Sequence, residues 1–98
     1  MVKHIIIWKL KEDVVDPAAV KAEIKEKLES LAGVIPGLLK MRIRTEGFDS
    51  SSGDLMMDSA FENEEALRRY QEHPAHLAAA NGAVRPNVSA RLSFDFEE

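Results

Sequence analysis

The alternation of apolar and polar residues along the chain predicts four β-strands. Three of them alternate with a period of two, so each has one apolar and one polar face. The first strand differs because it is apolar on both faces between His4 and Trp8, so both of its faces must be covered. The predicted strands span Val2 to Lys11, Leu38 to Glu46, Asp54 to Phe61 and Val88 to Glu97.

The same alternation predicts which residues share a face of the sheet. If His4 faces the helices, then Ile6 and Trp8 face them too. If Asp95 lies on that side, it brings Arg91 and Ser93 with it and sends the apolar residues of the last strand to the opposite face. In the second strand, the apolar set Leu39, Met41 and Ile43 alternates with the basic set Lys40, Arg42 and Arg44, which we interpret as a partly solvated row paired with carboxylates.

Between the strands the apolar residues recur with helical spacing. Asp16 is a predicted N-cap and Pro17 the first residue of a helix over 17–32. Asn63 is predicted to cap a second helix in which Tyr70 points inward. Pro74 is expected to begin a short third helix that ends near Asn81-Gly82.

The resulting order, β-α-β-β-α-β, predicts an α+β fold of the ferredoxin-like type, with a four-stranded antiparallel sheet and helices on one face. The 98 residues are enough for a single domain, which we assign to 1–98. The helices cover only one face of the sheet. We therefore assign the other face to a second copy of the chain and expect a homodimer, which also suits the small core of a short chain.

Composition narrows the classes of function. The chain has no cysteine, which excludes disulfides, thiolate catalysis and iron–sulfur clusters. Its net charge of −4 argues against a general nucleic-acid binder, and the two central strands lack the aromatic residues of an RNA-recognition domain. No signal pattern or membrane-length apolar run is present, so we expect a cytoplasmic protein without a membrane partner.

The candidate chemistry lies between Tyr70 and His76, where two of the three histidines flank a proline. His73 is expected to cap a helix end, which places His76 in the first turn of the next helix. The positive end of the helix dipole disfavours a charged imidazole there, and a neutral imidazole can accept a proton. A polar helix junction without chemistry is the alternative. Zinc binding is not expected, because no third or fourth soft ligand is near in the sequence.

Three sequence features together resemble the stress-responsive dimeric α/β-barrel (Dabb) family. The match extends over nearly the whole chain, and it implies a homodimer in which two sheets face each other as a barrel. The features are the start Lys3-His4 before an apolar strand, the turn Val34-Ile35-Pro36-Gly37, and the motif Tyr70-x-x-His73-Pro74-x-His76 followed by Phe94-Asp95-Phe96.

The resemblance also implies chemistry, because a plant member of the family is a cofactor-free polyketide cyclase. Its acid–base histidine and tyrosine fall on His76 and Tyr70, and its strand-one histidine falls on His4. The aspartate that contacts its catalytic histidine falls on Asp95, which is therefore expected to orient His76. The pocket departs from that of the cyclase, since Ile24 and Leu28 replace aromatic residues, and Arg91 and Ser93 replace apolar ones. The same polyketide is therefore not the expected substrate.

We expect a pocket between sheet and helices for a small, partly apolar carbonyl compound, with no cofactor and no metal. Three functions stay open: acid–base chemistry of the cyclase, isomerase or lyase type, ligand binding or stress protection without turnover, and a cofactor-independent oxygenase. Whether the protein is an enzyme is not decided by the sequence. The expected substrate-binding residues are Ile6, Trp8, Ile24, Leu28, Met41, Met57 and Arg91.

Overall fold

The computed structural model describes residues 1–98 and has the predicted element order. The four strands form one antiparallel sheet in the order β2-β3-β1-β4. The ferredoxin-like expectation is therefore confirmed. The elements are β1 (Val2–Leu10), α1 (Pro17–Glu29), β2 (Leu38–Arg44), β3 (Leu55–Phe61), α2 (Glu64–Glu72), α3 (Pro74–Ala79), the π-helix η1 (Ala80–Val84) and β4 (Val88–Glu97).

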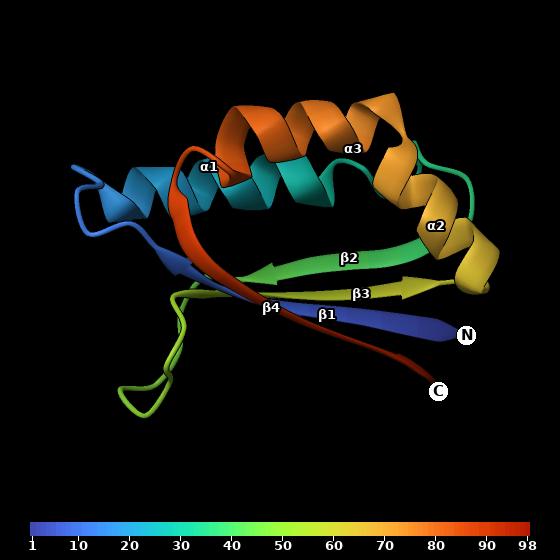
Figure 1. Ribbon diagram of the computed structural model, residues 1–98, viewed down its shortest axis with the longest axis horizontal. Helices are drawn as coiled ribbons and strands as arrows, with labels where there is room; N and C mark the ends of the chain where they lie inside the picture. Colours follow the sequence, from blue (N-terminus) through green and yellow to red (C-terminus); the bar gives the residue numbers. More distant parts are fainter.

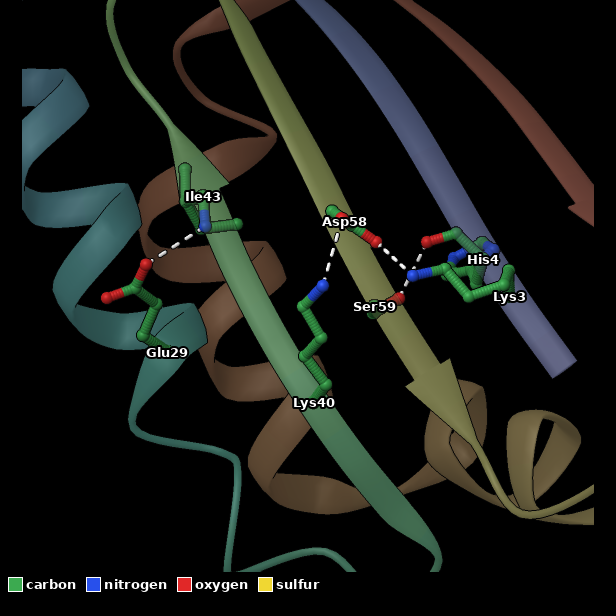
Figure 2. Close-up of polar contacts among 7 residues, drawn as sticks. All are labelled: Lys3, His4, Glu29, Lys40, Ile43, Asp58 and Ser59. Carbon is green, nitrogen blue, oxygen red and sulfur yellow. Dashed lines mark hydrogen bonds and ion pairs between the residues drawn. The ribbon is translucent and has the colours of Figure 1, made fainter. Parts of the chain in front are cut away.

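All helices lie on one face of the sheet, and the core fills the space between them and the strands (Figure 1). Strand pairing fixes which side chains reach this core. His4 lies opposite Ser59 on β3 and opposite Asp95 on β4, so these three residues share the helix-covered face. The Ser59 hydroxyl donates a 2.7 Å hydrogen bond to the main-chain oxygen of His4 (Figure 2). The predicted facing of β1 and β4 is confirmed.

The helix caps agree with the sequence. The Asp16 side chain accepts a 3.1 Å hydrogen bond from Ala19 N, and the Asn63 side chain accepts one of 2.9 Å from Ala66 N. These bonds satisfy main-chain N–H groups that have no partner within the first turn. Each cap acts within three residues of its own position, which explains why local sequence predicted it.

The predicted face of one residue and the predicted ends of two helices were wrong. A β-bulge between Leu38 and Lys40 turns Leu39 out of the core face, where Leu38 takes its place, and Leu39 is 53% exposed. The third helical segment does not end at Asn81-Gly82. It continues as a π-helix to Val84, because Ala83 and Val84 are buried against the core. The first helix ends three residues earlier than expected, at Glu29.

The sheet face away from the helices is bare and apolar. Ile7 is 42% exposed and Phe94 69% exposed, and the rings of Phe94 and Phe96 lie 5.9 Å apart there. An exposed apolar surface of this kind marks an interaction site. The loop between β2 and β3 projects beyond the sheet on the same side (Figure 1).

A short ion cluster also lies on this bare face. Asp58 binds Lys3 at 2.5 Å and Lys40 at 3.2 Å, and Figure 2 shows its carboxylate between the two ammonium groups. The hydrogen bond from Lys3 holds the pKa of Asp58 below its ordinary value, against the opposing effect of burial. The basic row of β2 is therefore paired with a carboxylate at Lys40, as expected.

Edge strand β2 is protected by α1. Glu29 accepts a 2.9 Å hydrogen bond from the main-chain N–H of Ile43 (Figure 2), and Lys25 donates one of 3.2 Å to the main-chain oxygen of the same residue. These side chains satisfy groups that would otherwise be open to another strand.

No helix is long and apolar enough to span a bilayer.

Candidate functional site

A cavity of about 380 Å³ lies between the sheet and the helices. Its wall is mixed, with an apolar middle and polar side chains that come from β1, α2, α3, β4 and the residue after η1. This size and character suit a small organic ligand. The twelve lining residues are His4, Ile6, Trp8, Leu28, Met57, Tyr70, Gln71, His76, Ala80, Val84, Arg85 and Arg91.

The predicted proline-centred junction holds two of these groups together. His73 ends α2, and its Nδ1 accepts a 3.0 Å hydrogen bond from Ala75 N at the start of α3. His73 is thus a structural cap. Pro74 begins α3 and places His76 beside the last turn of α2, so the rings of Tyr70 and His76 lie 4.3 Å apart at an angle of 42°.

His76 is half-buried, and burial lowers its pKa below the ordinary value because it penalises imidazolium. The main-chain carbonyl of Gln71 opposes this effect, while the nearby charges of Arg85, His4 and Arg91 add to it. The Nδ1 atom of this ring is buried and has no hydrogen-bond partner within the chain. The direction agrees with the sequence-based expectation of a neutral ring, but burial rather than the helix dipole is the main cause.

Tyr70 is almost fully buried, and this burial raises the pKa of its hydroxyl well above the ordinary value. Arg91 opposes the shift slightly through its charge. A phenol in this environment stays protonated at neutral pH and can donate a hydrogen bond to a ligand oxygen. The inward orientation of Tyr70 expected from its helix is confirmed.

The expected contact between Asp95 and His76 is not formed. His4 Nδ1 instead donates a hydrogen bond to Oδ1 of Asp95, its directly opposed residue on β4. The expectation that Asp95 orients His76 was therefore wrong. His4 belongs to the same aromatic cluster as Tyr70, with ring centroids 6.4 Å apart, so Asp95 supports the cluster through His4.

Five of the seven predicted substrate-binding residues line the cavity, namely Ile6, Trp8, Leu28, Met57 and Arg91. Ile24 and Met41 do not line it and pack in the core away from the cavity wall. The sequence missed Gln71, Ala80, Val84 and Arg85. The last three belong to or follow the π-helix, and no pattern in the sequence predicts this helix.

No three histidine, aspartate or glutamate side chains come together as a metal site would require. The cavity wall offers imidazole, phenol, amide and guanidinium groups instead. These groups can donate hydrogen bonds, stabilise negative charge and move a proton.

Comparison with known proteins agrees with this arrangement. The model of the family described as Stress Responsive A/B Barrel Domain (Dabb) matches residues 2–98, which confirms the resemblance seen in the sequence. None of the curated proteins matches the chain.

Several solved structures share the fold. A dimeric protein of unknown function with a ferredoxin-like fold from Bacteroides fragilis is 27% identical, with a TM-score of 0.90 over 99% of this chain and 95% of that chain. A dimeric ferredoxin-like protein of unknown function from Thermobifida fusca is 22% identical, with a TM-score of 0.85 over 99% and 90%. A hydroxynitrile lyase from Passiflora edulis is 15% identical, with a TM-score of 0.79 over 97% and 90%. The last two likenesses are of fold alone.

Proposed function

Because the chain belongs to the stress-responsive A/B barrel domain family, we propose that it forms a homodimer whose cavity binds a small, partly apolar carbonyl compound and catalyses proton transfer on it without a cofactor. The observation that carries the proposal is the half-buried His76 in the cavity wall, with its lowered pKa and its ring against Tyr70. Neutral imidazole beside a protonated phenol is a base paired with a hydrogen-bond donor.

The proposed reaction begins at a C–H bond next to the carbonyl group. The neutral imidazole of His76 takes the proton, and the electron pair of that bond moves to the carbonyl oxygen to form an enolate. The Tyr70 hydroxyl donates a hydrogen bond to this oxygen, which has more negative charge in the transition state than in the substrate. The lowered pKa of His76 then favours return of the proton to carbon or oxygen. Isomerisation, aldol-type ring closure and lyase steps all follow this course.

His4 and Asp95 have a positioning role in this scheme. The hydrogen bond to Asp95 fixes the His4 ring, and the four rings of His4, Phe61, Tyr70 and His76 form one contiguous cluster. Phe61 and Tyr70 lie 4.9 Å apart within it. A rigid cluster keeps the Tyr70 hydroxyl and the His76 ring in a fixed relative position, which acid–base catalysis requires.

Dimer formation is proposed from the bare sheet face. Its apolar residues from β1 and β4 need a cover, and two of the similar structures are described as dimeric. In the proposed dimer a second sheet covers this face, away from the cavity on the helix side.

The test is hydrogen–deuterium exchange at the carbon next to the carbonyl of a ketone such as 4-phenyl-2-butanone, followed by NMR in heavy water. We expect exchange to be faster with the protein than in buffer and to fall about a hundredfold or more in His76→Gln, the usual effect of losing a general base. Tyr70→Phe should also slow it.

His73→Asn is the matched control, because asparagine also caps helices and His73 lies outside the cavity wall. Its exchange rate should equal that of the unsubstituted protein. Equal rates for His76→Gln and the unsubstituted protein would refute catalysis. Saturable ketone binding without exchange would favour the second candidate, a ligand-binding protein without turnover.

A further inference from the structure

The charges in the cavity wall differ from those of the chain as a whole. The chain has 17 acidic and 13 basic residues, yet the twelve lining residues include two arginines and no carboxylate. A concave surface with charge of one sign raises the local concentration of ligands of the opposite sign. The wall of this cavity therefore favours an anionic ligand, although the protein itself is acidic.

Neither arginine is neutralised by the protein. None of the ion pairs in the structure involves Arg85 or Arg91. The guanidinium group of Arg85 donates a hydrogen bond only to the amide oxygen of Asn81, which is uncharged. Both guanidinium charges act on His76, where they lower the pKa of the ring, so their field reaches this part of the cavity wall.

The arginines lie at the Trp8 end of the cavity, since Trp8, Arg85 and Arg91 also line a neighbouring hollow together. Arg91 is directly opposed to Trp8 in the pairing of β4 with β1. His4, Ile6 and Trp8 line the cavity at successive positions of one strand face, and four residues of strand extend about 13 Å. The ring of Tyr70 lies near His4 at the other end, and the side chain of Met57 lines the wall beside Ile6.

We propose that the ligand is an oxo acid whose carboxylate is bound by Arg91 with the help of Arg85, while its carbonyl group reaches Tyr70 and His76. The role of the carbonyl group in this inference rests on the proposed function. Binding of the carboxylate does not depend on that reaction and can be tested separately. The planar guanidinium group matches a carboxylate with two parallel hydrogen bonds. The apolar part of the wall at Ile6 and Met57 contacts the carbon atoms of the ligand that lie between its carboxylate and its carbonyl group.

The test compares 4-phenylbutanoate with 4-phenylbutanamide, which have the same shape and differ in charge. Trp8 is the only tryptophan and lies in the cavity wall, so its fluorescence reports binding of either compound. We expect the carboxylate to bind at least about fivefold more tightly than the amide, as an exposed but well-oriented ion pair allows. Arg91→Gln should remove this preference by weakening binding of the carboxylate, and Arg85→Gln should reduce it.

Arg68→Gln is the matched control, since Arg68 is an exposed residue of α2 outside the cavity wall. It should keep the preference. Equal binding of acid and amide, loss of both in Arg91→Gln, or no change in Trp8 fluorescence with either compound would overturn the inference. Ketone exchange through His76 is measured separately. If the protein exchanges the ketone but does not prefer the carboxylate, this inference has failed. If it prefers the carboxylate but does not exchange the ketone, the proposed function has failed.

Discussion

His4 and Asp95 are directly opposed on β1 and β4, and Nδ1 of His4 donates a hydrogen bond to Oδ1 of Asp95. His76, the proposed acid–base histidine, therefore lacks a carboxylate partner. Its protonation is governed by burial and by neighbouring positive charges instead. Such a ring is a weaker base than one paired with aspartate, and it releases a captured proton more readily.

The first prediction concerns this pair. Asp95→Asn should leave the titration of His76 unchanged, because Asp95 contacts His4, and should lower the free energy of unfolding by about 1 kcal/mol for the weakened hydrogen bond. NMR titration of the imidazole and urea unfolding measure the two effects. A clear shift of the His76 titration would contradict this prediction and show that the charge of Asp95 reaches His76.

The second prediction is a dependence of stability on pH. The folded-state pKa of His76 lies below its ordinary value of 6.5, so between these two values the unfolded chain binds more protons than the folded chain. Stability due to His76 is therefore complete above about pH 6.5 and decreases as the pH falls through this window. Urea unfolding at several pH values should show this loss in the unsubstituted protein and in Lys27→Ala. In His76→Gln the loss of unfolding free energy at low pH should be smaller by the contribution of His76. A loss as large as that of the unsubstituted protein would contradict the prediction.

The third prediction separates backbone strain from crowding. Gly33 and Gly37 both have positive φ, at 88° and 83°. A Cβ at Gly33 would meet nothing, whereas one at Gly37 would lie 2.6 Å from Cβ of Ala66 in α2. Gly33→Ala should cost about 1 kcal/mol for the left-handed backbone alone.

Gly37→Ala should cost about 1–3 kcal/mol more than Gly33→Ala, because it also forces α2 away from the turn. Replacing Ala66 by glycine in the same chain should recover part of the difference. Calorimetry or urea unfolding measures all three variants. Equal losses for Gly33→Ala and Gly37→Ala would mean that the contact with α2 does not constrain the fold.

The fourth prediction tests the bare sheet face. Ile7→Lys should dissociate the proposed dimer, because it buries an unpaired charge at a cost of several kcal/mol. Val15→Lys is the matched control, since Val15 is 99% exposed in the loop before α1. Light scattering should give about twice the chain mass of 10.9 kDa for the control and the chain mass for Ile7→Lys. A monomer in the unsubstituted protein at micromolar concentration would refute the dimer.

Much of the fold could be predicted because its signals are local. Strand faces follow from alternation over a few residues, and the caps Asp16 and Asn63 bind main-chain groups three positions ahead. The proline after His73 likewise fixed the helix junction and brought His76 back toward Tyr70. These features depend on neighbours in the chain, so the sequence by itself determined the element order, the inward face of α2 and most of the apolar cavity wall.

Only the tertiary structure decided which polar groups pair. Asp95 shares a sheet face with His4, 91 residues away, and strand register places it against that residue rather than His76. The bulge that exposes Leu39 and the π-helix that brings Arg85 into the cavity wall arise from packing between distant elements. A hydrogen bond or cavity wall depends on positions within about an ångström, which are set by the whole packed core and not by local periodicity.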